Sequence, residues 1–539
     1  MAGAARRICL LGWVLLSLGL PKLQAAVRDV RTYGATGNGI TDDSAALYNA
    51  IAALVPGDTL LFSCGTYLTT AELVVSVSHV TIDGSGCATI HNVGSSGRLG
   101  IFVVGGNATT DPFYGPAVPL SQAAHELDTS FTTVSDPGVS PGDYIYIHQG
   151  GLDYSTDTPP GHPTGCDVSA CRGEVLKVQS VDGNTITVTT ALHDTYDPVV
   201  NAAVVQKMLD PVTGVTVKHI TFEGTQAQWL GFEMNGVVDS EVRDVTARNV
   251  QGPAIHSSGS FNLSYRHITV TQAGSEACGN AVNLFVGGNM SVHKMTISNE
   301  NPGTGTGCLG GGAFGFGLYA VADSKFDHVT VDASGAYGRP FKTVAARWNT
   351  FDSVRVENGA GDGNGINLEY YSSHNTFNRC LVINNSAGTG TGNGNAGIIS
   401  FGNFNQYNRF KNCTVAGNGN IQFYVSSFDA LGLAEDSDVT IKGGTFTGMN
   451  NVEPVILIAG SQAAVKRATI TGEGVVGLSV QAPDACVKHN TLAGTFSSGG
   501  ILVSDPTTDI GEGNILNGNS SNLGVGECEA RESISPFGP

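Results

Sequence analysis

The feature that most constrains the fold is a sequence unit that recurs along most of the chain. The segments GINLEYYSSHNTFNRCLVINNS (365–386) and GIISFGNFNQYNRFKNCTVAGN (397–418) share their apolar letters and differ mainly in the polar letters between them. Each unit has an apolar residue, another three positions later and a third two positions after that, as in Phe377, Cys380 and Val382. Successive copies are mostly 22 to 27 residues apart. A unit this short cannot bury its own apolar face, so neighbouring units must stack.

The repeat predicts short β-strands joined by turns, because apolar and polar residues alternate within a unit and Gly, Asn and Asp lie between strands. Coiling such units places equivalent residues on parallel strands about 4.8 Å apart, in stacked columns. We therefore expect an all-β fold, a right-handed parallel β-helix in which each unit forms one rung. A β-sandwich or a propeller is the alternative, but no propeller signature accompanies the repeat. Two interior columns are expected: Phe326, Phe351, Phe377 and Phe410, and Cys380 with Cys413.

Two segments do not follow the repeat. Arg6 and Arg7, followed by ICLLGWVLLSLGL, predict a secretory signal peptide that is cleaved after Ala25 or Ala26. Between the first copy and the main series, alternating strands with turns at Pro-Gly and Asp-Gly-Asn predict a small β-rich insertion. The expected division is a signal peptide (1–25), an N-terminal cap with the first rungs (26–108), the insertion (109–205) and the main β-helix (206–539).

The cysteines fit an exported protein. Of the 11 cysteines, Cys9 lies in the signal peptide, which leaves an even number in the mature chain. A zinc site is the rival interpretation, but no CxxC motif or paired histidines support it. Reduced thiols that stack in the core remain an alternative for Cys380 and Cys413. The spacing suggests these pairs: Cys64 with Cys87, Cys166 with Cys171, Cys278 with Cys308, Cys380 with Cys413, and Cys486 with Cys528.

The charge balance limits the partners. The chain has 46 Asp and Glu against 27 Lys and Arg, a formal charge of -19. An acidic surface repels phosphate backbones, so nucleic acid is not expected as a partner. The same charge weakly disfavours a heavily anionic polymer substrate unless a basic patch or a cation intervenes. No apolar run after the signal peptide is long enough to cross a membrane. No cofactor or metal is expected, and the oligomeric state stays open, a trimer included.

The segment TYGATGNGITDDSAALYNAI (32–51), followed by LLFSCGTY (60–67), resembles the opening of the pectate-lyase-like superfamily, particularly its polygalacturonase-related proteins. Members usually have Pro or Ala where this chain has Ser63-Cys64. Within the motif, Ser44 to Leu54 is amphipathic, with Asp42 and Asp43 as N-cap candidates, and we expect a helix that covers the open end of the coil. The resemblance implies a right-handed β-helix that acts on polysaccharides as a hydrolase, lyase or epimerase.

The resemblance identifies no catalytic group. The polygalacturonase signatures Asn-Thr-Asp, Gly-His-Gly and Arg-Ile-Lys and the Asp-Pro-His of alginate epimerases are missing from the sequence. Candidate site residues must therefore come from the repeat. A residue between two core residues of a strand points outward, and polar and aromatic side chains on a rigid sheet suit a sugar chain. We expect Glu233, His256, Asn283, Tyr319 and Asn367 in one outward row and Glu369 and Tyr424 in a second, with Lys342, Arg347 and Tyr371 as further substrate contacts.

Glycoside hydrolysis needs two carboxyl groups about 5–9.5 Å apart. Glu233 and Glu369 are five rungs apart, about 24 Å, so they cannot form that pair. We expect Glu369 as the catalytic acid, with Asp362 in the turn before its strand as the second carboxyl group. The prediction is a secreted carbohydrate-active enzyme, first a glycoside hydrolase. The alternatives are a polysaccharide lyase or uronate epimerase, for which His256, Tyr319 and Lys342 supply the residue types, and a non-catalytic glycan-binding surface protein.

Overall fold

The structure is a computed structural model that describes residues 25–94, 100–106, 114–149, 172–200, 202–274, 280–298, 314–334, 340–359, 364–385, 396–401, 405–426, 437–449 and 452–521. Residues 1–24 of the predicted signal peptide, the Cys166–Cys171 and Cys278–Cys308 pairs, Cys528 and Asp362 lie outside these residues. No helix among the described segments is long and apolar enough to span a bilayer.

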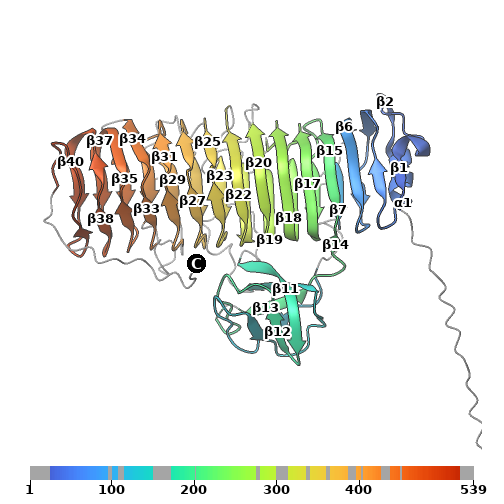
Figure 1. Ribbon diagram of the computed structural model, residues 1–539, viewed down its shortest axis with the longest axis horizontal. Helices are drawn as coiled ribbons and strands as arrows, with labels where there is room; N and C mark the ends of the chain where they lie inside the picture. The colour runs from blue at the N-terminus through green and yellow to red at the C-terminus, as the bar shows by residue number, and fades with distance from the viewer. Residues whose placement is uncertain are drawn as a thin grey trace, which may run out of the picture.

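The described strands coil into one right-handed parallel β-helix, as the repeat predicts (Figure 1). Its first face is built from strands that begin each rung, and long strands such as β18 and β37 turn a corner and belong to more than one face. The first face contains β5 (Leu73–Val75), β7 (Phe102–Gly105), β16 (Phe232–Asn235), β18 (Ile255–Thr271), β19 (Asn280–Gly288), β21 (Phe314–Ala322), β23 (Phe341–Val344), β26 (Ile366–Glu369), β29 (Ala396–Phe401), β32 (Ile421–Val425), β35 (Ile456–Ile458), β37 (Thr469–Val480) and β40 (Thr495–Val503).

The second and third faces complete each rung. The second face contains β3 (Thr59–Leu61), β6 (Thr81–Asn92), β15 (Thr216–Glu223), β17 (Val237–Arg248), β20 (Ser291–Ser298), β22 (Lys325–Asp332), β24 (Thr350–Asp352), β27 (Thr376–Asn378), β30 (Arg409–Lys411), β33 (Thr440–Lys442), β36 (Ala464–Lys466), β38 (Cys486–Lys488) and β41 (Asp509–Ile510). The third face includes β4 (Gly65–Thr69), β25 (Arg355–Glu357), β28 (Leu381–Ile383), β31 (Thr414–Ala416), β34 (Thr445–Met449) and β39 (Thr491–Leu492).

The predicted interior columns are confirmed. Phe326, Phe351, Phe377 and Phe410 occupy one register position on successive rungs, with ring centroids 4.9, 4.4 and 4.9 Å apart and planes within 15° of parallel. All four side chains are buried. The column is therefore a continuous aromatic stack inside the coil, which the repeated Phe of the sequence unit produces.

The cysteine column is also confirmed, as a disulfide. Cys380 and Cys413 lie on adjacent rungs with Cα atoms 4.5 Å apart and are bonded to each other. The predicted pair Cys64–Cys87 is bonded as well, with Cα atoms 4.9 Å apart. Cys486 is disulfide-bonded. Two of the predicted pairs thus cross-link neighbouring rungs.

A row of buried asparagines marks the corner between the first and second faces. The amide oxygen of Asn375 accepts a hydrogen bond from the backbone N–H of Asn349 at 3.1 Å, and its amide nitrogen donates to the Ala346 carbonyl at 2.8 Å. Asn408 repeats the contact one rung later. The residue before each of these asparagines has a φ of 56° or 57°, which turns the chain sharply. The asparagines satisfy the backbone groups that this turn leaves unpaired.

The N-terminal motif closes one end of the coil. Helix α1 (Ser44–Ala52) lies over the first rung, although it ends at Ala52 and not at the predicted Leu54. Asp42 accepts a hydrogen bond from the Ser44 N–H at 2.9 Å. Asp43, the other cap candidate, makes no cap hydrogen bond; its carboxylate accepts from the Thr36 N–H at 2.7 Å and holds the preceding loop. The two acidic residues of the motif are therefore structural.

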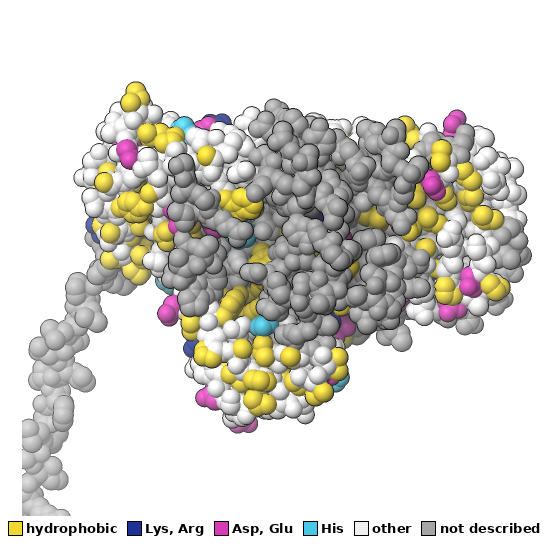
Figure 2. Space-filling model, turned by 180° about the vertical axis from the view of Figure 1, so that it is seen from behind, with side chains coloured by type: hydrophobic (Ala, Val, Ile, Leu, Met, Phe, Trp, Pro, Cys, Tyr) yellow, Lys and Arg dark blue, Asp and Glu magenta, His cyan; other side chains and the backbone are white. Residues whose placement is uncertain are grey.

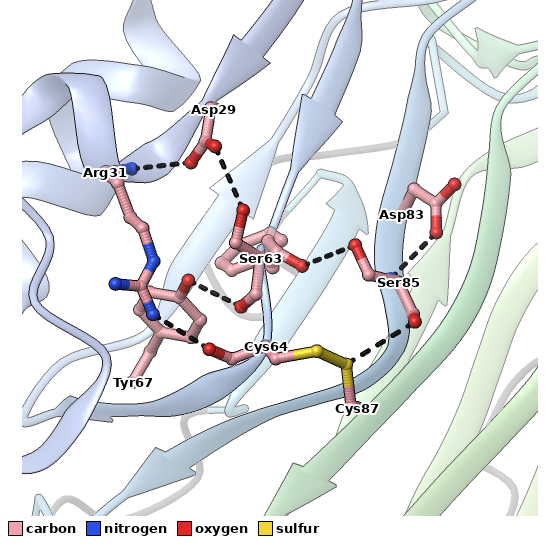
Figure 3. The surroundings of a disulfide bond; sticks show 9 residues. Asp29, Arg31, Ser63, Cys64, Tyr67, Asp83, Ser85 and Cys87 are labelled. Atoms are coloured by element: carbon pink, nitrogen blue, oxygen red, sulfur yellow. Dashed lines mark hydrogen bonds between the residues drawn. A yellow bond between two sulfur atoms is a disulfide. The ribbon is translucent and has the colours of Figure 1, made fainter.

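The first disulfide is surrounded by contacts that tie this cap to the rungs (Figure 3). The Arg31 guanidinium donates to the Cys64 carbonyl at 2.8 Å, and the Tyr67 hydroxyl donates to the Ser63 carbonyl at 2.7 Å. Ser63 in turn donates to Asp29 at 3.0 Å. The Ser-Cys dipeptide that departs from the usual Pro or Ala of the superfamily thus contributes to the contacts that hold the cap.

A second sheet lies beside the coil. Six antiparallel strands are ordered β8 (Val118–Pro119), β13 (Ala203–Lys207), β10 (Tyr144–Gln149), β11 (Gly173–Asp182), β12 (Thr185–Val188) and β9 (Ser130–Thr132). The chain leaves the coil after β7 and returns at β14 (Val212–Thr213), yet β7 and β16 still pair directly. Tyr144 and Tyr146 of this inserted sheet pack on Phe261 and Val286 of the coil. In Figure 2 the inserted sheet projects from the coil as a separate lobe.

Candidate functional site

Polar side chains follow one another along the outward side of the first face. The observed row is Glu233, His256, Asn283, Gly317, Lys342, Asn367, Ile399 and Tyr424, which are register partners on successive rungs. The second row contains Phe285, Tyr319, Val344 and Glu369. Tyr319 and Tyr424 are thus each one row away from their predicted places. In both cases the register is shifted by two residues, which keeps the side chain outward but changes its neighbours.

Glu233 lies at the N-terminal end of the row and is almost fully buried, with 3% of its surface exposed. Its carboxyl group accepts a hydrogen bond from the Asn235 amide at 2.7 Å. A second carboxylate, that of Glu72, accepts from the Gly100 N–H at 2.7 Å, and the carboxyl group of Glu233 lies against the Cα of the same glycine. Glu72 and Glu233 therefore flank the same glycine.

This environment keeps a proton on Glu233. Burial, with a smaller contribution from the negative charge of Glu72, raises the pKa of Glu233 to about 8, against an opposing effect of the Asn235 hydrogen bond. A neutral carboxyl group at pH 7 is suited to donate a proton. The adjacent rung carries His256, whose pKa burial lowers to about 4. At neutral pH the row therefore begins with a protonated acid beside an uncharged imidazole.

Three polar atoms in this part of the face have no hydrogen-bond partner among the described residues. They are Oδ1 of Asn235, Nδ1 of His256 and Oδ1 of Asn283. They belong to three successive rungs, and Asn235 lies beside Glu233 in the second row. Buried polar atoms in proteins nearly always have a partner, so this row lacks one that a polar ligand would supply.

Lys342 and Glu369 lie further along the face and form an ion pair. Their charged atoms are 2.9 Å apart, with 11% and 5% of the side chains exposed. The Lys342 ammonium is also 5.9 Å from the centroid of the Tyr319 ring, and the Tyr319 hydroxyl accepts from the Asn280 amide at 3.3 Å. An ammonium group this close stabilises a negatively charged carboxylate. Glu369 is therefore poorly suited to the general-acid role that we expected, and Asp362, its expected partner, lies outside the described residues.

Arg347 and Tyr371 lie in the contact with the insertion and not on the outward row of the first face. Arg347 is 2% exposed and is ion-paired with Asp194. Arg172 bonds the same carboxylate at 2.7 Å, and its guanidinium lies 4.4 Å from the centroid of the Tyr371 ring. These two predicted substrate contacts therefore hold the insertion against the coil. Asn367 stays on the row, with its amide oxygen accepting from Asn364 at 3.0 Å.

One group of described residues has the geometry to hold a metal ion. The ligand atoms of His293, Asp327 and His328 lie within 4.8 Å of one another on the second face, away from the row. Glu72 is the site residue that sequence reasoning missed. It precedes β5 in a rung that the insertion separates from the main repeat, and only the stacking of β5, β7 and β16 shows that it is near Glu233.

Comparison with known proteins supports the parallel β-helix fold. The family described as "Rhamnogalacturonase A/epimerase, pectate lyase-like" matches residues 27–283. No curated protein matches the sequence. The tailspike protein gp49 from Pseudomonas phage LKA1 has a similar structure over 90% of this chain and 81% of its own, with 13% identity and a TM-score of 0.55. The gp54 tailspike of Acinetobacter baumannii bacteriophage AP22, solved with A. baumannii capsular saccharide, matches over 90% and 76%, with 14% identity and a TM-score of 0.50.

Proposed function

We propose that the protein is a secreted carbohydrate-active enzyme that hydrolyses a polysaccharide or oligosaccharide bound along the first face, and the match of residues 27–283 to a pectate-lyase-like family supports this proposal. The observation that carries this proposal is the row of unpartnered polar atoms on Asn235, His256 and Asn283, next to the protonated Glu233. Sugar hydroxyls both donate and accept hydrogen bonds, so a sugar chain along the row would satisfy all three. The predicted signal peptide and the disulfides are consistent with export.

In this proposal Glu233 replaces Glu369 as the general acid. A glycosidic oxygen leaves more readily when it is protonated, and Glu233 holds a proton at neutral pH. Glu72 is the second carboxyl group of the pair. It flanks the same Gly100 and is the acidic group whose charge acts on Glu233. As a carboxylate, Glu72 would activate water or attack the sugar directly.

The rest of the row binds the substrate. Asn283, Lys342 and Asn367 offer hydrogen bonds on later rungs, and Tyr424 offers an aromatic ring. Lys342 and Glu369 form a fixed pair of charges about 14–19 Å from His256, three and four rungs along the coil. A sugar chain that reaches both places must span several residues. We therefore propose a polymer or a long oligosaccharide as the substrate.

The test compares three matched Glu→Gln variants on a panel of polysaccharides, with reducing ends and unsaturated products measured in parallel. We expect Glu233→Gln and Glu72→Gln to lower turnover by about 10²–10⁴ while substrate binding survives. Glu369→Gln is the control on the same face, and its turnover should fall far less. Near-normal turnover of Glu233→Gln would remove Glu233 from the reaction.

A second reaction is favoured by one specific observation, the uncharged imidazole of His256 beside Glu233. A base and a proton donor on adjacent rungs are what an elimination or an epimerisation at a uronate needs. The same assay separates the reactions, since elimination produces unsaturated sugars. If unsaturated products appear and His256→Ala abolishes them, the reaction is an elimination and not a hydrolysis.

A further inference from the structure

Four lysines stack on successive rungs in the C-terminal half of the coil. Lys411, Lys442, Lys466 and Lys488 are the last residues of β30, β33, β36 and β38 and are direct register partners. Strands β33 and β38 are on the side of the coil shown in Figure 1. We call these four residues the lysine row. It lies on the second face, whereas Glu72 and Glu233 lie on the first.

Each lysine of the row is followed three positions later by a threonine. Thr414, Thr445, Thr469 and Thr491 are likewise register partners, across the corner between the second and third faces. The sequence therefore repeats Lys-x-x-Thr in four consecutive units. The lysine row and the threonine row run side by side along the coil axis, and each supplies one polar group per rung.

A cavity of about 570 Å³ opens between the two rows. Lys411, Lys442, Thr445 and Thr469 line it, together with Arg467 from the corner. Gly443 has a φ of 71°, and a side chain there would collide with the Asn412 amide. The corner therefore has no room for a side chain at position 443, which lies on the lining of the cavity.

The lysine row is electrostatically unfavourable by itself. Like charges directly opposite each other on neighbouring strands, about 4.8 Å apart, repel. Burial, Arg409 and Lys442 together lower the pKa of Lys411. Lys411, Lys442 and Lys488 form no ion pair within the described part of the chain. Acidic residues outnumber basic ones in the chain, yet no acidic residue of the described segments forms an ion pair with these three lysines.

We propose that the lysine row and the threonine row bind an acidic polysaccharide whose carboxylate or sulfate groups repeat along the coil axis. One or two lysines are enough to bind a single small anion. The row continues over four rungs, which favours a polymer with repeating charges. Threonine hydroxyls beside the ammonium groups add hydrogen bonds to sugar oxygens. This is the basic patch that an acidic protein needs in order to bind an anionic polymer. The binding does not depend on the reaction proposed for the first face.

The first experiment measures binding of the full chain by calorimetry to polygalacturonate, dextran sulfate, uncharged dextran and single-stranded DNA. We expect binding to polygalacturonate, dextran sulfate or both, with an affinity that falls as salt is added, because salt screens exposed charges. The two acidic polymers distinguish carboxylate from sulfate recognition. Equal binding to uncharged dextran, or tighter binding to DNA than to both acidic polysaccharides, would overturn the proposal.

The second experiment compares two double variants of equal charge change. Lys442→Gln with Lys466→Gln removes the middle of the lysine row, and Lys294→Gln with Lys325→Gln removes two exposed lysines elsewhere on the coil. We expect the first variant to bind the acidic polymer about tenfold more weakly and the control to bind within about twofold of the wild type. Equal losses in both variants would show that net charge, and not the row, controls binding. Thermal unfolding checks that both variants fold.

Discussion

Arg347 of the coil and Asp194 of the insertion, in the segment between β12 and β13, form an ion pair in the buried contact between the insertion and the coil. Arg172 donates to the same carboxylate, and its positive charge together with that of Arg347 holds the pKa of Asp194 below its ordinary value. Replacing Asp194 with Asn leaves the buried Arg347 charge without its partner. We expect a loss of about 3–5 kcal/mol in the free energy of unfolding, measured by chemical denaturation.

The control for this prediction is an exposed ion pair on the same coil. Arg379 and Asp352 are 2.6 Å apart, with 64% and 32% of their side chains exposed. Asp352→Asn should change the free energy of unfolding by no more than about 1 kcal/mol. If Asp194→Asn is equally mild, the inserted sheet is held by its apolar contacts and not by this charge.

The phenylalanine stack should dominate the stability of the central rungs. Phe377 is buried between Phe351 and Phe410, with centroids 4.4 and 4.9 Å away. Phe377→Ala removes both contacts and leaves a cavity, so we expect a loss of about 3–5 kcal/mol. Phe377→Leu keeps most of the volume and should cost clearly less. Similar losses for the two variants would mean that cavity formation does not control stability at this rung.

Stability should decrease as the pH rises through the range set by Glu233. Its folded pKa of about 8 lies above the ordinary value of 4.5, so the folded state retains a proton that the unfolded state releases. The retained proton makes its full contribution to the free energy of unfolding below pH 4.5. This contribution, roughly 3–5 kcal/mol, is lost by the time the pH exceeds 8. Glu233→Gln removes this dependence. Melting temperatures of the wild type and variant between pH 5 and 9 test it, and parallel curves would contradict the raised pKa.

The pH dependence of turnover should follow the protonation of Glu233. If Glu233 is the general acid, turnover on an active substrate falls about tenfold for each pH unit above about pH 8, where its proton is lost. Glu72 must be ionised, so activity also falls at acid pH. The alkaline limb is measured from initial rates on one substrate with the enzyme's stability checked at each pH. A profile that stays flat beyond pH 9 would assign the acid role to another residue.

The interior of the coil was predictable from the sequence because residues that stack inside the coil recur at the same position of each unit. The repeated Phe and the Cys380–Cys413 pair fix the rung register by themselves. The outward rows were less predictable. Gly315 and Gly317 both resemble the start of a unit, and a shift of two residues keeps every side chain on its own side of the strand. This ambiguity placed Tyr319 in the wrong row. Tyr424 was misplaced in the same way, because Ile421 and Phe423 are both apolar and Phe423 is the true partner of Ile398.

The candidate site could be predicted only in part, for two physical reasons. Glu233, His256 and Asn283 follow from the repeat, but Glu72 comes from a rung on the other side of the insertion in the sequence. The roles of Glu233 and Glu369 depend on burial and on charged neighbours, which the repeat does not contain. The sequence contains the lysine row as a repeated Lys-x-x-Thr. This row lies on the second face, whereas the candidate site residues were sought on the first.

The disulfide between Cys380 and Cys413 also determines how the coil can come apart. Rungs of a repeat protein contact only their neighbours, so the chain can fray from its C-terminal end one rung at a time. Fraying that has passed β38, where Cys486 is itself disulfide-bonded, and continues through β36 and β33 meets a further covalent link at Cys413. Under mechanical pulling from the C-terminus, the extension should therefore pause at this rung in oxidising conditions and continue once the bond is reduced. The disulfide would make the two rungs that it joins leave the coil together, as one cooperative unit, whereas the rungs of β36 and β33 leave one at a time.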